Sequence, residues 1–254
     1  MKNLKKRLRN NDALIGCLLN LGNPLTAEIV GQAGFDWVMI DLEHGAGNEK
    51  DTLPQLQVLQ HNSTAAIIRV ESNDKRRIQR ALDMGADGII CPQVETVADV
   101  QSVIEGMYYY PDGKRGVAPS VRAARFGEDF DLYRQQSKDK LLCIIQIETK
   151  EVLNHLDDIA ALDGVDALFI GPLDLTMALG IFGQFDHVHY IDAVKAVVAS
   201  ATKGEKSLGI YLPDTEDYKT YYDLGFRLFA CGTDTAFLAQ GAKQMAKTLD
   251  SKRN

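Results

Sequence analysis

The sequence predicts an α/β protein, a closed (β/α)8 TIM barrel that forms a single domain over residues 1–254. Three observations favour this fold. A unit of helical stretch, glycine and short apolar strand recurs along the chain, eight apolar runs alternate with stretches of helical spacing, and no linker interrupts them. Apolar strands that alternate with helices indicate a parallel sheet buried on both faces. The length of 254 residues is also close to the roughly 250 residues typical of such barrels.

Four of the eight expected strands follow a glycine that ends a helix. Glycine adopts the left-handed conformation that closes a helix more readily than other residues, so each one marks a junction between helix and strand. The segments marked in this way are residues 34–41, 85–91, 164–170 and 225–231. The other four apolar runs are residues 14–19, 65–70, 141–148 and 207–212.

The stretches between the strands carry helical spacing and good helix formers. We expect helices at residues 74–84, 96–107, 150–162, 192–203, 215–224 and 235–249. The alternative fold is an open, doubly wound sheet, but the Gly-x-Gly-x-x-Gly fingerprint is absent after the first strand. The longest connection, residues 108–127, has no regular pattern and is expected to be functional or to contact a neighbouring chain.

Composition and charge favour a cytoplasmic enzyme that acts on small molecules. The net charge is −7 with both signs interspersed, so no basic surface for nucleic acid is expected. The four cysteines lie far apart in apolar segments, which indicates buried thiols in a reducing compartment. No apolar run approaches the roughly 18 residues of a membrane span. Asn10, Asn11 and Asp12 lie where a signal peptide would be apolar, so no secretory signal is expected.

Polar residues collect at the carboxyl ends of the expected strands, where such a barrel carries its active site. Glu148 ends one strand and shares its face with Gln146, whereas Asp174 follows the next strand. Two carboxylates from neighbouring strands can bind Mg²⁺ or Mn²⁺ and leave positions open for substrate oxygens and water. The alternative is structural: Asp174 caps a helix that starts near residue 175, and Glu148 pairs with a lysine.

Arg69 and His44 favour catalysis over a structural role. A guanidinium in an apolar strand needs an anion, and its planar fork suits a substrate carboxylate. His44 follows Asp41 by three residues, a spacing that lets Asp41 orient the imidazole and stabilise its cation, and histidine carries protons near neutral pH. None of the eight runs has a lysine in its interior. Activation of a carbonyl is therefore expected from a metal rather than from a Schiff base.

Two other motifs carry weaker expectations. His187 and His189 have a spacing seen in metal sites, but they lie in a polar loop and are expected to be solvated. The turn Gly-Lys-Arg-Gly at residues 113–116 can bind a phosphate through its amides and cations, or it can shape a subunit contact.

Together these residues resemble the 4-hydroxy-2-oxoheptanedioate aldolase family, the metal-dependent class II pyruvate aldolases of the HpcH/HpaI type. The resemblance runs from about residue 14 to residue 234 and depends on the order and spacing of its motifs. These are Asp41-Leu-Glu-His-Gly45, Ile68-Arg69-Val70, residues 83–92, residues 113–116, Gln146-Ile-Glu148 and residues 169–175.

The resemblance implies a barrel of the phosphoenolpyruvate/pyruvate-domain type and a homo-oligomer. The family pattern is a hexamer of three dimers, in which the last helix, about residues 235–249 here, is exchanged between partners. The resemblance also implies a divalent cation held by Glu148 and Asp174. Mg²⁺ and Mn²⁺ are expected first, with Co²⁺ or Zn²⁺ as alternatives.

The implied reaction is the reversible cleavage of a 4-hydroxy-2-oxo acid to pyruvate and an aldehyde. His44, supported by Asp41, would remove the proton of the 4-hydroxyl group. Arg69 would bind the carboxylate and keto oxygen of pyruvate and, with the metal, stabilise the pyruvate enolate. The other substrate-binding positions that the resemblance implies are Gln146, Gly171, Pro172, Leu173 and Leu212.

Two alternative functions stay open. One is a lyase for CoA esters such as malyl- or citramalyl-CoA, whose nucleotide would need the basic stretch 114–125. The other is a barrel that binds oxo acids without turnover, although simple binding has no need for a proton carrier such as His44. The natural aldehyde is also open, because the sequence departs from the family pattern at residues 46–48, Asp112 and Phe182.

Overall fold

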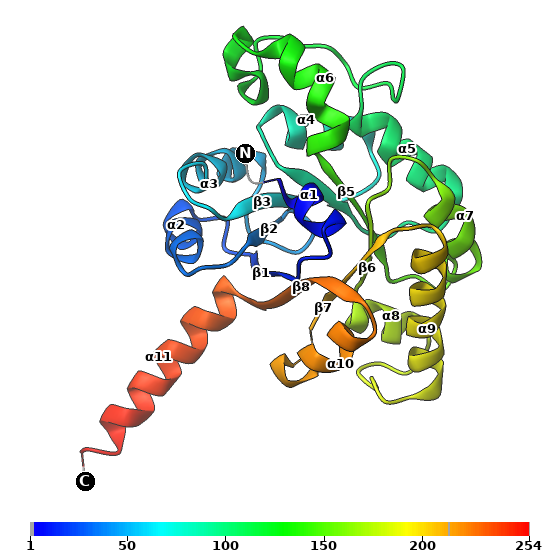
Figure 1. The fold of residues 1–254 in the computed structure, drawn as a ribbon. Coiled ribbons are helices and arrows are strands. Elements are labelled where there is room, and N and C mark those ends of the chain that lie inside the picture. Colours follow the sequence, from blue (N-terminus) through cyan, green and yellow to red (C-terminus); the bar gives the residue numbers. More distant parts are fainter. Residues whose placement is uncertain (1–2, 213, 254) are drawn as a thin grey trace.

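The computed structural model of the protein, which describes residues 3–212 and 214–253, is the predicted closed barrel (Figure 1). Eight parallel strands pair in chain order, and β8 returns to pair with β1. The strands are β1 (Leu14–Leu19), β2 (Trp37–Asp41), β3 (Ala65–Arg69), β4 (Gly88–Cys91), β5 (Leu142–Ile147), β6 (Ala167–Ile170), β7 (Ser207–Tyr211) and β8 (Phe226–Thr233).

Helices alternate with these strands and surround the barrel. In chain order they are α1 (Leu4–Arg9), α2 (Pro24–Gln32), α3 (Glu49–Leu59), α4 (Lys75–Asp83), α5 (Val97–Met107), η1 (Arg122–Gly127), α6 (Phe130–Lys140), η2 (Val152–His155), α7 (Leu156–Ala161), α8 (Pro172–Ala178), α9 (Val188–Lys203), η3 (Thr215–Asp217), α10 (Tyr218–Asp223) and α11 (Asp234–Asp250). None of the helices among the described residues combines the length and the apolar character of a bilayer span.

The glycines that mark the helix-to-strand junctions behave as predicted. Gly34, Gly85, Gly164 and Gly225 have φ values of +99°, +98°, +108° and +99°, which favour glycine. The six predicted helices are present, although two of them begin with the short 3₁₀ turns η2 and η3, and α9 begins before residue 192. The helices for which no range was predicted are α1, α2, α3, α6 and α8.

The apolar core has two layers. The larger layer lies between the strands and the outer helices. The inner layer fills the barrel, where Trp37 and Phe169 meet edge to face with their ring centroids 6.3 Å apart. Leu4 and Leu8 of α1 join this inner layer, and Lys5 lies 2.9 Å from Asp166, so α1 closes the amino end of the barrel. The carboxyl end is left for function.

The connection after α5 is held to the barrel by a buried arginine. The guanidinium of Arg115 packs over the rings of Tyr109 and Tyr133, at 4.8 and 5.4 Å, and lies 2.6 Å from Asp83. The neighbouring Lys114 pairs with Glu105. The cations of the Gly-Lys-Arg-Gly turn are therefore engaged within the chain, so this structure does not support the phosphate-binding alternative.

Candidate active site

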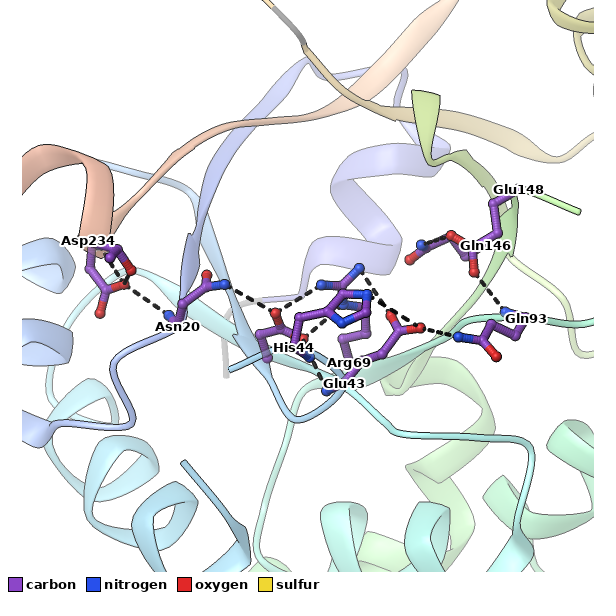
Figure 2. Close-up of polar contacts among 10 residues, drawn as sticks. Asn20, Glu43, His44, Arg69, Gln93, Gln146, Glu148 and Asp234 are labelled. Carbon is purple, nitrogen blue, oxygen red and sulfur yellow. Dashed lines mark hydrogen bonds and ion pairs between the residues drawn. The ribbon is translucent and has the colours of Figure 1, made fainter. Parts of the chain in front are cut away.

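A chain of hydrogen bonds and ion pairs crosses the carboxyl end of the barrel (Figure 2). Its members, in order, are Asp234, Asn20, Asp41, Arg69, Glu43, Gln93 and Glu148. They come from the start of α11 and from the ends of β1 to β5. Side chains from six neighbouring segments thus meet at one mouth of the barrel, at the end where the sequence predicts a site.

Arg69 and Asp41 form the buried centre of this chain. They are register partners on β3 and β2, so their side chains point to the same face. Nε and Nη2 of Arg69 donate to the two carboxylate oxygens of Asp41 at 2.9 and 2.8 Å. Burial opposes the ionisation of Asp41, but the hydrogen bonds and charge of Arg69 outweigh it and lower the pKa of Asp41. The pair is therefore ionised at neutral pH.

Glu43 is a site residue that was not predicted from the sequence. Its Oε2 atom lies 3.1 Å from Nη1 of Arg69, and its side chain is buried. The available signal was its spacing, because residues two apart in extended chain share a face and Asp41 points to Arg69. A guanidinium has five N–H donors, and two of them donate to Asp41, whereas the contact with Glu43 is an ion pair. The protein itself supplies the anions for Arg69, and N–H donors remain for a ligand.

His44 lies at the rim of the barrel mouth with its side chain 60% exposed. The predicted contact between its imidazole and Asp41 is not formed, because the Asp41 carboxylate points to Arg69. From His44 this carboxylate accepts the backbone N–H, at 3.3 Å, and no side-chain hydrogen bond. The carboxylate beside the ring is Glu43 instead, with 3.8 Å between Nε2 and Oε1. The exposed imidazole can exchange protons with solvent or with a ligand.

Glu148 is a buried carboxylate held by neutral donors. Its Oε1 atom accepts the backbone N–H of Gln93 at 2.7 Å, and Oε2 accepts Nε2 of Gln146. No lysine or arginine nitrogen among the described residues lies within 4.0 Å of it, so the predicted alternative of a lysine pair is wrong for this structure. Burial raises the pKa of Glu148, and the negative charges of Glu43 and Asp174 add to this effect.

Asp174 lies in the first turn of α8, with its side chain exposed. The N-cap residue of α8 is Gly171 and not Asp174, so the alternative in which Asp174 caps the helix is not observed. Gly171, which precedes α8, packs closely against the residues at the end of β5. A Cβ atom at this position would lie 2.9 Å from Oε2 of Glu148. Pro172 is buried at the start of α8, and Leu173 is exposed.

The structure places two groups of residues considered in the sequence analysis away from this site. Leu212 is buried in the layer between strands and helices, whereas Tyr211 packs against the inner layer. Neighbouring residues of a strand point to opposite faces, so the prediction that Leu212 faces the substrate was wrong by one position. The spacing of His187 and His189 has a structural cause, because Nδ1 of His187 caps α9 by accepting the backbone N–H of His189 at 3.2 Å.

Glu148 and Gln146 at the end of β5 and Asp174 after β6 carry oxygen atoms of the kind that a divalent cation binds. Oε1 of Gln146 is buried and has no hydrogen-bond partner among the described residues. The mutual repulsion of the carboxylates would be relieved by a positive ion. Mg²⁺ is commonly held by one or two carboxylates and several waters. In the part of the chain that the structure describes, no group of three His, Cys, Asp or Glu side chains is arranged to hold a metal ion.

Replacing Asp41 with Asn is expected to lower the free energy of unfolding by about 3 kcal/mol at neutral pH, because a buried ion pair loses one partner. The native pKa of Asp41 is below its ordinary value. Its contribution to stability is therefore present above that ordinary value, about 3.8, and is lost as the pH falls through the lower native value. Urea unfolding of both proteins at pH 7 and at about pH 3 measures this. A stability difference that stays constant or widens at low pH would contradict the assignment.

Comparison with known proteins identifies the relatives of this chain. The model of the family described as HpcH/HpaI aldolase/citrate lyase matches residues 14–241. A protein of Klebsiella pneumoniae named 5-keto-4-deoxy-D-glucarate aldolase is 35% identical over 95% of this chain and 94% of its own length. A solved structure of a family protein from Burkholderia cenocepacia J2315 is 33% identical and covers 98% of this chain and all of its own, with a TM-score of 0.92.

A second solved structure, of an HpcH/HpaI aldolase from Desulfitobacterium hafniense DCB-2, has 28% identity and a TM-score of 0.90 over 97% of this chain and 96% of its own. The family predicted from the sequence motifs is thus confirmed at the level of HpcH/HpaI, and with it the prediction of an aldolase-type lyase. The specific name 4-hydroxy-2-oxoheptanedioate aldolase is not the one that the similar Klebsiella protein carries. The chain belongs to the HpcH/HpaI aldolase/citrate lyase family.

Proposed function

We propose that this protein is a divalent-metal-dependent aldolase that cleaves a 4-hydroxy-2-oxo acid reversibly to pyruvate and an aldehyde. The observation that carries the proposal is that a buried guanidinium and carboxylates lie at the same mouth of the barrel. Arg69 keeps N–H donors for an anionic oxo acid, and the charge of Glu148 acts on Arg69 while the charge of Asp174 acts on Glu148. Family membership supports the same class of reaction.

Glu148 and Asp174 would hold the cation, with Mg²⁺ or Mn²⁺ favoured by their oxygen ligands and Co²⁺ or Zn²⁺ as alternatives. When bound, such an ion supplies Lewis acidity to a carbonyl oxygen. Gln146 supports this region, because its Nε2 atom fixes one oxygen of Glu148 and its unpartnered Oε1 faces the same buried space as a further acceptor. Gly171 packs so closely on these side chains that a Cβ atom there would lie 2.9 Å from Oε2 of Glu148 and 3.1 Å from Nε2 of Gln146.

The remaining residues would bind the oxo acid and move its proton. Arg69 would donate its free N–H groups to the carboxylate and 2-oxo oxygen, with residues 171–173 lining the same end. The exposed imidazole of His44 would accept the proton of the 4-hydroxyl group. The bond between carbons three and four then breaks, its electron pair stays on carbon three, and the aldehyde leaves. Protonation of carbon three completes pyruvate.

The name of the Klebsiella relative suggests a sugar-acid substrate. Numbered from its keto end, a 5-keto-4-deoxyglucarate is a 2-oxo, 3-deoxy, 4-hydroxy acid with a second carboxylate at the far end. We infer that a substrate of this dicarboxylic class is favoured here. The 4-hydroxy-2-oxoheptanedioate predicted from the family resemblance has the same reacting half and two carboxylates, so both acids belong in the first substrate screen.

The CoA-ester alternative is less favoured. It needs cations in the stretch 114–125 for the nucleotide, and each of them has a partner in the chain, although Lys114 and Arg125 stay 70% exposed: Lys114 with Glu105, Arg115 with Asp83, Arg122 with backbone carbonyls and Arg125 with Asp129. A pyruvate-release assay separates the proposed function from its alternatives. We expect pyruvate from 4-hydroxy-2-oxo acids, loss of release with a chelator, and recovery with Mg²⁺ or Mn²⁺. Release from a CoA ester alone, or tight oxo-acid binding without turnover, would overturn the proposal.

We also propose that the chain is one barrel domain whose last helix packs on a partner chain within a hexamer of three dimers. Helix α11 projects away from its own barrel (Figure 1). Leu238, Met245 and Leu249 are exposed, and their spacing of seven and four residues places them on one face of this helix. On the barrel, Ile15 of β1 and Ile29 of α2 are exposed as well. We propose that α11 of a second copy of the chain packs on the side of the barrel that carries Ile15 and Ile29.

Replacing Leu238 with Glu is expected to dissociate the oligomer, because a charge would enter the apolar face that the proposal buries. Sedimentation velocity measures the change. Lys243 lies on another face of α11, so Lys243→Glu is the matched control and should leave the assembly intact. An unchanged mass for Leu238→Glu, or a monomeric wild-type protein, would contradict the exchange of α11.

A further inference from the structure

Gln93 holds a backbone conformation that glutamine rarely adopts. It follows β4 and Pro92, and its φ angle is +53°, in the left-handed region. A residue with a Cβ atom pays roughly 1–2 kcal/mol for this conformation. Such outliers persist where surrounding contacts require them, and they cluster at functional sites. The contacts that Gln93 makes are therefore informative.

Two carboxylates from different strands accept hydrogen bonds from this one residue (Figure 2). The backbone N–H of Gln93 donates to Oε1 of Glu148 at 2.7 Å, and its Nε2 atom donates to Oε1 of Glu43 at 2.8 Å. Glu43 follows β2 and Glu148 follows β5, so the two acids would otherwise repel each other across the mouth. Gln93 bridges them without adding a charge.

Glu43, which Gln93 binds, lies beside Arg69 and His44, the two residues proposed to act on the ligand. Its other oxygen, Oε2, lies 3.1 Å from Nη1 of Arg69 and has no hydrogen-bond partner among the described residues. Its Oε1 atom, the one that Gln93 holds, lies 3.8 Å from Nε2 of His44. The orientation of the Glu43 carboxylate thus sets the surroundings of both Arg69 and His44. Among the described residues that follow β4, Gln93 is the one whose side chain donates a hydrogen bond to this carboxylate.

We propose that Gln93 is a positioning residue of the site, whose side chain fixes Glu43 so that Arg69 presents its free donors to the oxo acid. The left-handed backbone conformation directs the backbone N–H of Gln93 to Glu148 and its side-chain amide to Glu43. This inference deepens the proposed function and rests on it. It assigns Gln93 no direct part in bond breaking, so its effect reaches the ligand through Glu43 and Arg69.

The test separates the side chain from the backbone. Gln93→Gly keeps the N–H that binds Glu148 and accepts a positive φ without strain, but it lacks the amide that binds Glu43. Gln93→Asn also tolerates a positive φ and keeps an amide, yet it is one methylene too short. We expect both variants to lower kcat/KM for pyruvate release by about 10-fold to 100-fold, the range for a hydrogen bond to a charged group. Their affinity for pyruvate alone, measured by calorimetry with Mg²⁺ present, should fall in parallel, while the melting temperature stays or rises.

Glu205 provides a matched control, because it also has a positive φ, +55°, but lies before β7 at the opposite end of the barrel. Glu205→Gly should leave kcat/KM and pyruvate affinity unchanged. A double-mutant cycle completes the test: in a Glu43→Ala background, Gln93→Gly should have no further effect. Wild-type kcat/KM in Gln93→Gly and Gln93→Asn, or full additivity with Glu43→Ala, would overturn the inference. Failure of the proposed function would look different, since the wild-type protein itself would then release no pyruvate.

Discussion

Replacing Glu148 with Gln is expected to lower metal-dependent pyruvate release by at least about 1,000-fold, while the barrel stays folded. The loss corresponds to roughly 4 kcal/mol, the scale of the charge stabilisation that a bound cation supplies. The side chain keeps its shape, so Oε1 can still accept the N–H of Gln93. Gln146 can turn its Oε1 toward the new amide, and its Nε2 atom then takes the position where Oε1 had no partner. Steady-state kinetics at saturating Mg²⁺ measure the effect.

The stability of the same variant provides an independent check. Burial and neighbouring acids raise the pKa of Glu148, so its ionised form is disfavoured in the folded, metal-free protein at neutral pH. Removing that charge should raise the melting temperature of metal-free protein and abolish its increase on addition of Mg²⁺. Glu151→Gln, which changes an exposed carboxylate three residues further on, is the control for both measurements. Full activity of Glu148→Gln in the presence of a chelator would refute the metal assignment.

Replacing Arg69 with Ala is expected to destabilise the fold and to abolish binding of oxo acids. The side chain of Asp41 is fully buried and that of Glu43 nearly so, and both would lose their cation. Breaking a buried pair in this way costs about 3–5 kcal/mol. Arg69→Lys should recover part of the stability but not the binding, because an ammonium cannot serve Asp41 through two bonds and also reach Glu43 and a ligand.

Urea unfolding and calorimetry with pyruvate measure the two effects of Arg69 separately. Arg77→Ala is the control, since the ion pairs of this half-exposed arginine with Glu49 and Glu71 lie at the surface and contribute little to stability. An Arg69→Lys protein that binds pyruvate as tightly as the wild type would show that the planar fork is not needed. In that case Arg69 would be a structural counter-ion for Asp41 and Glu43 only.

The barrel could be predicted because its signals are local. Each glycine at a helix end and each apolar run is visible within a few residues, and the eight strands follow from them. Helix α1 was missed because its six residues look like a basic tail. The burial of Lys5 depends on Asp166, which is far away in sequence and appears only once the barrel closes. Helix α8 is only seven residues long and gives no periodic pattern, so it was expected only through the capping alternative, which placed a helix start near residue 175.

The sequence predicted which residues lie at the site better than it predicted which of them contact each other. Asp41, Arg69, Gln146 and Glu148 lie at the strand ends where the barrel rule predicts functional side chains. Which carboxylate binds which base depends on register, and the pairing of Asp41 with Arg69 removes Asp41 from the imidazole of His44. The same dependence on register explains the one-residue error at Leu212.

Crystals grown with Mn²⁺ and measured at its absorption edge test the central claim most directly. The account predicts one anomalous peak in the barrel mouth, about 2.2 Å from a carboxylate oxygen of Glu148 and of Asp174, with the remaining positions open to water or pyruvate. A peak at another place, or no peak beside these two carboxylates at saturating Mn²⁺, would contradict it.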